Sequence, residues 1–378
     1  MMASLVFWAA VALTVYITVG YPLLLRLSAG QSGPAVKKDF SFQPTVSAII
    51  AVYNGEAFLR AKLESILNLD YPSSKLDIWI VSDGSTDSTE KVAREFASKS
   101  VKLLCQNRSG KAAALNLALT QAQGEILFLT DVRQQLHRDA LKHLTANFAD
   151  PSVGAVTGEM KLHSPDAGEQ ADMDLYWRYE LWARAQHSRL DSLFNTTGCI
   201  YAIRRELMAP IPPDTLTDDA VIPLRAFFRG YRVIFDLAAI AYDQPAVGGT
   251  EFRRRWRTLA GLWQVHARLP VLFTAANRMR WHFLSHKFSR LLLPWALLAL
   301  AVSIVFMPDS WLRRTCFAGE LAVILLAALD ALVPQGWLAK RLTSPVRTFL
   351  VMNVAALAAL SVFFISPQVL WKPTRIRQ

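Results

Sequence analysis

Acidic side chains stand in the middle of this 378-residue sequence at points where short apolar runs end. Asp83 and Asp131 each follow such a run, and Asp219 is the second member of an adjacent pair with Asp218. Carboxylates can accept hydrogen bonds, bind a divalent cation or remove a proton. Because a single acid can also cap a helix, only the convergence of several acids would indicate a site.

Four apolar runs alternate with helical patterns and predict the strands that position these acids: residues 46–52, 76–81, 101–105 and 126–130. Such an alternation is typical of an α/β fold with a mostly parallel sheet and right-handed crossovers. Ligands then bind outside the carboxyl ends of the strands. Tyr53, Glu56, Asp83 and Asp131 all fall there, so we expect them to line one crevice.

Both ends of the chain are hydrophobic. No charge occurs between Met1 and Leu25, which is enough to cross a hydrocarbon core roughly 30 Å thick. The stretch lacks the basic start of a cleaved signal peptide, so a retained anchor is favoured. Three later stretches, residues 291–308, 315–332 and 348–371, are also apolar, and the middle one carries Glu320 and Asp330. The expected division is a transmembrane helix at 1–28, a catalytic domain at 29–250, amphipathic interfacial helices at 251–290 and a transmembrane bundle at 291–371.

Basic residues set the expected orientation. Arg26, Lys37 and Lys38 follow the first apolar stretch and place the next domain in the cytoplasm by the positive-inside rule. Four crossings would leave the basic tail, residues 372–378, outside, against that rule. A re-entrant segment would resolve the conflict, so the number of crossings stays open. The expected location is therefore a plasma membrane, crossed more than once.

The formal net charge of +11 could indicate a nucleic-acid partner. Much of the excess lies in residues 251–290, just before a membrane stretch, which favours contact with anionic lipid headgroups instead. Phe252, Trp256, Leu259 and Trp263 form an apolar stripe on the same predicted helix. The three cysteines lack metal-ligand spacing.

Four segments, in this order and spacing, resemble the family 2 inverting glycosyltransferases of the Rossmann-like GT-A fold: AVYNGE at 51–56, VSDGSTD at 81–87, RSGKAAALN at 108–116 and FLTD at 128–131. The resemblance covers about residues 45–265. The flanking apolar segments resemble the membrane-bound bacterial branch of that family, which includes relatives of cellulose, hyaluronan and poly-N-acetylglucosamine synthases. The resemblance implies an α/β domain that binds a nucleotide sugar.

The resemblance also implies roles on the donor side. Asp83 would hydrogen-bond the nucleotide base, with Tyr53 and Glu56 lining the same pocket, and Lys111 would approach the base or the diphosphate. Asp131 matches the first acid of the Asp-x-Asp element and would bind Mg²⁺ or Mn²⁺. Arg133 replaces the second acid, which weakens the expected metal site, although an inward-pointing arginine could neutralise phosphate charge.

On the acceptor side, Thr217–Asp218–Asp219 resembles the Thr-Glu-Asp element, which makes Asp219 the expected catalytic base. Gly198 and Cys199 belong to a segment that resembles the acceptor-side lining. Arg255 and Trp256 match the last two residues of the Gln-x-x-Arg-Trp element of processive synthases, but Phe252 replaces the glutamine. For Trp256, membrane anchoring and acceptor contact both stay open.

The expected function is inverting transfer of a sugar, from a UDP-sugar, to a lipid-linked or polysaccharide acceptor at the inner membrane face, in cell-envelope or exopolysaccharide biosynthesis. Other polysaccharide-assembly proteins are further conceivable partners. Two alternatives remain: a processive polysaccharide synthase coupled to export, and a non-catalytic scaffold or nucleotide-sugar sensor.

Overall fold

The computed structural model describes residues 1–28, 33–162, 175–244, 251–334 and 336–366. It separates into two compact units. One contains Ser28–Ala246, and the other combines Met1–Leu27 with Val247–Gln378. The first unit has nearly the limits expected for a catalytic domain, while the finer division of the second at 290/291 stays a prediction.

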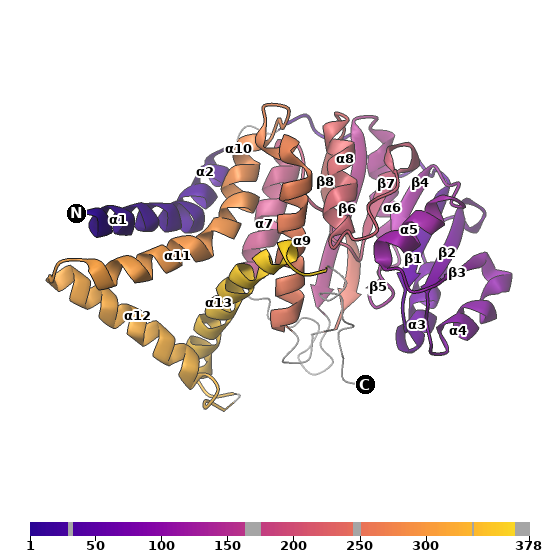
Figure 1. The fold of residues 1–378 in the computed structure, drawn as a ribbon. Helices are drawn as coiled ribbons and strands as arrows, with labels where there is room; N and C mark the ends of the chain where they lie inside the picture. The colour runs from indigo at the N-terminus through magenta and orange to yellow at the C-terminus, as the bar shows by residue number, and fades with distance from the viewer. Residues whose placement is uncertain (29–32, 163–174, 245–250, 335, 367–378) are drawn as a thin grey trace. The chain divides into compact units, whose positions relative to one another are not determined.

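An eight-stranded sheet runs through the described part of the unit at 28–246, in the order β3-β2-β1-β4-β7-β6-β8-β5 (Figure 1). The strands are β1 (Val46–Val52), β2 (Leu76–Asp83), β3 (Val101–Gln106), β4 (Ile126–Leu129), β5 (Gln135–Leu136), β6 (Val153–Leu162), β7 (Tyr201–Arg204) and β8 (Arg232–Asp243). Strands β1 to β4 are parallel neighbours, as predicted. Strand β7 is antiparallel to β4 and β6, and β6 is parallel to β8. The predicted α/β class is confirmed.

Helices cover this sheet: α3 (Glu56–Leu67), α4 (Thr89–Glu95), α5 (Lys111–Leu119), α6 (Ala140–Ala146), α7 (Leu175–Leu190) and α8 (Asp218–Phe228). Leu59, Leu63 and Ile66 recur at helical spacing on α3 and are fully buried in the core with strand residues such as Ile50 and Phe128. Burial explains the apolar runs of β1, β2 and β4, whereas β3 lies at the edge of the sheet and is only partly buried.

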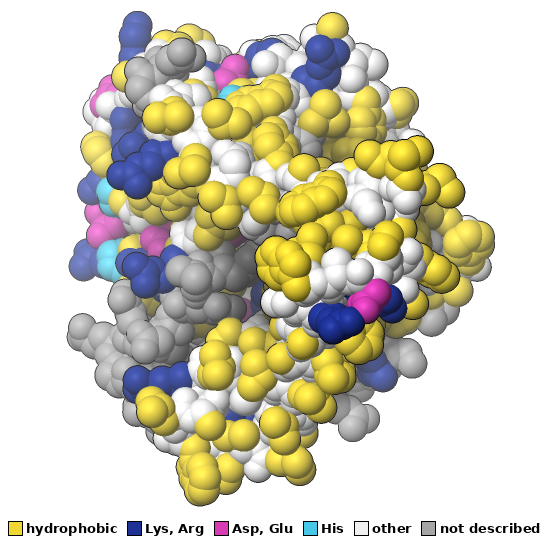
Figure 2. All heavy atoms as spheres, turned by 90° about the vertical axis from the view of Figure 1, so that its left-hand side faces the viewer, with side chains coloured by type: hydrophobic (Ala, Val, Ile, Leu, Met, Phe, Trp, Pro, Cys, Tyr) yellow, Lys and Arg dark blue, Asp and Glu magenta, His cyan; other side chains and the backbone are white. Residues whose placement is uncertain are grey.

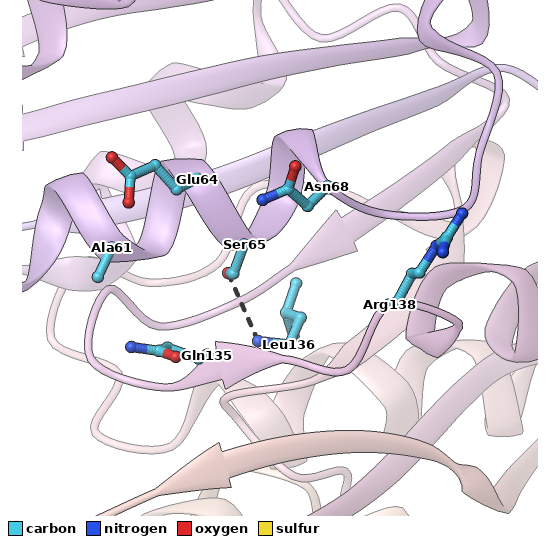
Figure 3. A pocket seen from close by; sticks show the side chains of 7 residues that line it. All are labelled: Ala61, Glu64, Ser65, Asn68, Gln135, Leu136 and Arg138. Carbon is cyan, nitrogen blue, oxygen red and sulfur yellow. Dashed lines mark hydrogen bonds between the residues drawn. The ribbon is translucent and has the colours of Figure 1, made fainter.

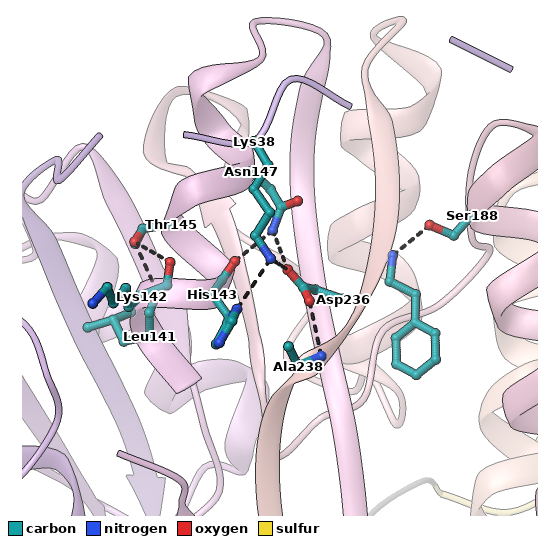
Figure 4. A network of polar contacts seen from close by, with 10 residues as sticks. Lys38, Leu141, Lys142, His143, Thr145, Asn147, Ser188, Asp236 and Ala238 are labelled. Carbon is teal, nitrogen blue, oxygen red and sulfur yellow. Dashed lines mark hydrogen bonds and ion pairs between the residues drawn. The ribbon is translucent and has the colours of Figure 1, made fainter. Parts of the chain in front are cut away.

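The segment that leads into β1 is fixed by a polar network on β8 (Figure 4). Lys38 Nζ lies 2.5 Å from Asp236 Oδ2, and Asn147 Nδ2 donates to the same oxygen at 2.7 Å. Asp236 sits beside an irregularity in the β6–β8 register, and its other carboxylate oxygen accepts from the Ala238 N–H at 3.1 Å. The network therefore joins the segment before β1 to the irregular part of β8, and it contains none of the predicted site residues.

The second unit is helical: α1 (Met2–Val15), α2 (Tyr21–Ser28), α9 (Glu251–Arg268), α10 (Arg280–His282), α11 (Ser289–Phe306), α12 (Trp311–Leu329) and α13 (Lys340–Ala358). Within the described residues, three helical stretches are long and apolar enough to cross a membrane: Met2–Ser28, Arg280–Phe306 and Lys340–Phe363. Figure 2 shows hydrophobic side chains gathered over the face that α1, α11 and α12 present. Exposed hydrophobic side chains on these three helices include Leu5, Trp8, Leu298, Val302 and Ile324.

The apolar stripe of α9 packs inside its own unit. Trp256 Nε1 donates to the Ala358 carbonyl at 2.9 Å and to Ser361 Oγ at 3.1 Å, and the Trp263 ring lies 6.4 Å from that of Phe363. The end of the predicted bundle at 371 and the basic tail lie outside the described residues. The contacts of Trp256 therefore favour packing against the end of α13, while its role toward an acceptor stays a prediction.

Candidate active site

Lys111 and two acidic residues meet beyond the end of β4. Lys111 is the first residue of α5, and its Nζ donates to Asp131 Oδ1 at 2.9 Å and lies 3.2 Å from Asp218 Oδ1. Burial alone would lower the pKa of Lys111, but the charges of Asp131 and Asp218 outweigh it and raise the pKa. The lysine therefore stays protonated and holds together carboxylates that would otherwise repel each other.

Gly198 lies where the predicted donor side and the predicted acceptor side of the site meet. A Cβ atom added to Gly198 would lie 3.6 Å from Asp219 Oδ2 and 3.8 Å from Asp131 Oδ2. Both carboxylates thus face one small space that glycine leaves clear of side-chain atoms. Burial, then the neighbouring Asp218 charge, raises the pKa of Asp219 to about 7. A carboxylate with a pKa near neutrality suits a general base.

Asp219 is held in place by a defect in its own helix. It lies in the first turn of α8, and Pro223 stands four residues later, inside the helix. Since proline has no N–H, the Asp219 carbonyl gets no bond from that position. It accepts instead from the Thr196 N–H at 2.7 Å and from Thr196 Oγ1 at 3.0 Å. The proline therefore leaves this carbonyl free to anchor the turn that carries Gly198.

Asp83, at the end of β2, is buried and engaged by the loop at residues 106–110. Its carboxylate accepts from Gln106 Nε2 at 2.8 Å and from the Ser109 and Gly110 N–H groups at 2.7 and 2.9 Å, and it pairs with Arg108. These bonds place the loop before Lys111. The predicted bond from Asp83 to a nucleotide base stays a prediction.

The other predicted donor-side residues, Tyr53 and Glu56, follow the end of β1. The Arg108 guanidinium stacks over the Tyr53 ring, with Cζ 3.7 Å from the ring centroid. Glu56 Oε2 accepts from the Ser88 N–H at 2.7 Å, so this side chain turns toward the start of α4. Tyr53 with Arg108 thus forms a cation–aromatic surface beside Asp83, whereas Glu56 joins two loops.

Arg133 does not join the carboxylate cluster. It forms an ion pair with Asp243, the last residue of β8, and Gln134 Nε2 donates to the same carboxylate oxygen at 2.8 Å. Asp243 is buried, so the pair is shielded from solvent. Asp243 was not predicted, because its partner lies 110 residues away in the chain and only the position of β8 brings them together.

Cys199 and Lys62 lie beneath the site. The Cys199 side chain is buried, and burial, then the Asp131 charge, raises the pKa of its thiol to about 12, so it stays protonated. Lys62 on α3 is also buried and bonds to Thr130 and to the Gln134 carbonyl. Lys62 was not predicted as a site residue, although a lysine between Leu59 and Leu63 on an apolar helix face is itself a signal.

A separate hollow of about 360 Å³ is lined by Ala61, Glu64, Ser65, Asn68, Gln135, Leu136 and Arg138 (Figure 3). None of the predicted site residues lines it. Arg255 and Trp256 belong to the helical unit, so their predicted acceptor-side roles remain untested by the geometry of this cluster.

The residues fit a divalent cation only in part. No group of three or more His, Cys, Asp or Glu side chains within the described residues is arranged to hold a metal. The Asp131 side chain is 41% exposed and offers an outer oxygen toward Gly198. Mg²⁺ is commonly held by one or two carboxylates together with substrate phosphates. Asp131 therefore suits a cation that arrives with a diphosphate rather than a preformed protein cage.

Comparisons with known protein families and sequences show which proteins this chain is similar to. The family model described as glycosyl transferase family 2 matches residues 47–210. The beta-monoglucosyldiacylglycerol synthase of Nostoc sp. is 31% identical over 217 residues, which cover 54% of this chain and 44% of that protein. The poly-beta-1,6-N-acetyl-D-glucosamine synthase of Staphylococcus aureus is 23% identical over 230 residues, covering 59% of this chain and 53% of that protein. The chain thus spans about half the length of these curated relatives.

Among solved structures, the mannosyltransferase PcManGT from Pyrobaculum calidifontis, in complex with GDP-Man and Mn²⁺, is similar over 95% of this chain and 99% of that chain. The TM-score is 0.76 at 25% sequence identity. The similarity extends beyond the sheet to most of the helical unit. Residues 47–210 therefore form a glycosyl transferase family 2 domain, on a GT-A fold.

Proposed function

We propose that the protein transfers a sugar, with inversion, from a nucleotide sugar to a lipid-linked or polysaccharide acceptor at the cytoplasmic face of a bacterial plasma membrane. The observation that carries the proposal is the shared space at Gly198, faced by Asp131 on the donor side and Asp219 on the acceptor side. Basic residues after the first apolar helix, Arg26, Lys37 and Lys38, support the cytoplasmic placement.

The reaction is one displacement at the anomeric carbon. The acceptor hydroxyl oxygen forms the new bond to that carbon, while the bond from the carbon to the phosphate oxygen breaks and its electron pair leaves with the nucleoside diphosphate. Asp219 takes the acceptor proton as the bond forms. Lys111, which is cationic, and Arg108 supply positive charge on the donor side.

A divalent cation would add charge stabilisation for the leaving diphosphate. Asp131 is the residue that would hold it, through the oxygen that faces Gly198. Arg133 is engaged by Asp243, so the predicted inward role of Arg133 requires that this ion pair opens. In the proposal, the chain itself orients the donor and removes the acceptor proton.

The donor and acceptor are proposed at the level of chemical class. UDP-sugars are our first expectation, and the GDP-Man bound to PcManGT makes GDP-sugars the next to test. A lipid acceptor is supported by the name of the Nostoc relative and by the apolar helices of this chain. Participation in cell-envelope or exopolysaccharide biosynthesis follows from acceptors of this kind.

A processive synthase that exports its product is the second candidate, favoured by similarity to the Staphylococcus aureus synthase. A polar path across the membrane needs enough helices to enclose it, and the described residues contain three candidate spans. Together with Phe252 in place of glutamine, this favours single or limited transfer. The lengths of labelled products on a gel distinguish the two.

The test is a screen of UDP- and GDP-sugars with membranes that contain the full chain, with Mn²⁺, with Mg²⁺ and with a chelator. We expect release of nucleoside diphosphate with one donor, dependence on a divalent cation, and loss of release in Asp219→Asn. Wild-type turnover by Asp219→Asn would show that this residue is not the base. No turnover of any donor would favour the non-catalytic sensor.

A further inference from the structure

Lys62 is an unusual residue for its position. It lies on α3 among buried apolar side chains, is 1% exposed, and forms no ion pair with any described residue. Removing a lysine amine from water is costly, and burial lowers the pKa of Lys62 to about 7. A leucine or methionine would fill the same space without that cost. The amine therefore needs an explanation other than packing.

Its hydrogen bonds supply one. Lys62 Nζ donates to Thr130 Oγ1 at 2.6 Å and to the Gln134 carbonyl at 2.7 Å. These two acceptors flank the segment that carries Asp131. Ser65, on the next turn of α3, accepts from the Leu136 N–H at 3.4 Å, so α3 borders this segment further along (Figure 3).

The link continues to the acceptor side. Thr130 Oγ1, which accepts from Lys62, donates its own proton to the Cys199 carbonyl at 2.6 Å. Cys199 follows Gly198, the residue whose missing side chain leaves the space between Asp131 and Asp219. One buried chain of hydrogen bonds therefore runs from Lys62 through Thr130 to the turn at residues 197–200.

We infer that Lys62 is a positioning residue that sets the donor-side segment at 130–134 against the acceptor-side turn at 197–200. The expected effect of Lys62 on turnover rests on the proposed function. Its expected effect on the rigidity of the two segments does not. Both the ammonium and the neutral amine carry at least two N–H donors, so the clamp persists as Lys62 titrates. Lys62 does not touch the reacting atoms, and it acts through Thr130.

Hydrogen exchange of the purified full chain, followed by mass spectrometry, tests the structural part without any substrate. In Lys62→Met, we expect exchange about tenfold faster in peptides that cover 126–136 and 195–203, since one buried hydrogen bond is worth about that factor. Lys142→Met is the control, because Lys142 forms an exposed ion pair with Asp70. Wild-type exchange in both peptides of Lys62→Met would overturn the inference and reduce Lys62 to a packing residue.

Substitutions of Thr130 test the centre of the link and serve if Lys62→Met does not fold. Thr130→Val removes both bonds of the hydroxyl, from Lys62 and to Cys199, and leaves only the bond from Lys62 to Gln134. Exchange should therefore be faster in 195–203, with a smaller increase in 126–136 than in Lys62→Met. Thr130→Ser keeps the hydroxyl and should restore wild-type exchange. Equal exchange in the valine and serine variants contradicts the inference.

The catalytic part uses the nucleotide sugar that the wild-type protein turns over. Lys62→Met and Thr130→Val should lower kcat on the order of tenfold to a hundredfold, with a smaller change in the KM for the donor, because the two sides are misplaced rather than lost. Thr130→Ser should stay near wild type. If no donor is turned over, the proposed function fails, while the exchange result still decides the structural role.

Discussion

At the scale of single residues, the site depends on the balance of charges around Lys111. Asp131 and Asp218 both contact its amine, and Asp219 stands next to Asp218. Like charges at such distances raise the pKa of one carboxyl group, and the lysine offsets part of that effect. Burial, then the Asp218 charge, raises the pKa of Asp219 to about 7, which suits this residue to accept a proton near neutral pH.

The pH dependence of kcat/KM should therefore show an acid limb with an apparent pKa near 7. Asp219 must be ionised to act as a base, and the pKa of about 7 is well above the value of 3.8 for a free aspartate. Activity should rise with pH up to about 7, as Asp219 ionises, and then level off. Rates between pH 5 and 9 measure it, and a limb near pH 4 would contradict the assignment.

Lys111→Met should move that limb to higher pH. The Lys111 charge lowers the pKa of Asp219, so its removal raises this pKa further. The expected result is a limb clearly above that of wild type, together with a higher KM for the donor. Lys142→Met, which removes a lysine from an exposed ion pair, is the matched control and should keep the wild-type limb. An unchanged limb in Lys111→Met would show that its charge does not act on the base.

The residues that converge were largely predictable, and their partners were not. Asp131, Lys111, Asp218 and Asp219 were predicted from strand ends and motifs, and the structure brings them together. The ion pair of Arg133 with a strand 110 residues later was not predictable, because partner choice depends on the three-dimensional course of β8. The position of a residue in the sequence indicates which strand end it follows. It does not indicate which polar side chain will pair with it in the folded protein.

At the scale of elements, the first turns of α8 show how one residue, Pro223, determines a local hydrogen-bond arrangement. Pro223 breaks the helical bond to the Asp219 carbonyl, and Thr196 uses the freed acceptor. We had predicted the acids at 218–219 but not the proline, which as a helix breaker would first suggest that the helix ends. Its role became visible only with the position of the Thr196 turn.

Pro223→Ala should separate stability from activity. Alanine supplies an N–H that can bond to the Asp219 carbonyl within the helix, which competes with Thr196 and loosens the turn before Gly198. We expect an unchanged or higher melting temperature and a several-fold lower kcat, a common trade between stability and activity. Pro294→Ala, at a proline inside α11, is the control for removing a helical proline. A kcat equal to wild type would show that the freed carbonyl is not needed.

The strands divide into those predicted and those missed for a physical reason. β1, β2 and β4 were predicted because buried strands form continuous apolar runs, and β3 was predicted from its own apolar run although it lies at the sheet edge and is only partly buried. β6 and β8 were not drawn, because each mixes apolar with polar or exposed positions and their register is irregular. The half of the sheet nearest the donor motifs was therefore predictable, while the half that supports the acceptor side was not.

At the scale of the whole molecule, the apolar ends were predicted as membrane segments, and three helical stretches of the described residues have the length and composition for crossing. The apolar stretch at 315–332 was the weakest of the predicted segments, and α12, which contains most of it, is not among the three. It carries Arg313, Arg314 and Glu320, which makes a full crossing costly. Hydropathy alone could not decide this, because the charges lie within an otherwise apolar helix.

The number of spans after the catalytic unit predicts the side of the C-terminus. Two candidate spans, Arg280–Phe306 and Lys340–Phe363, follow residues 28–246, so the chain should return to the side of the catalytic unit. This agrees with the positive-inside rule for Lys372, Arg375 and Arg377, whereas a crossing by α12 as well would not. A C-terminal fusion to green fluorescent protein should fluoresce in cells, and one to alkaline phosphatase should be inactive. Active phosphatase would mean an odd number of crossings after the catalytic unit and would make α12 a third span there.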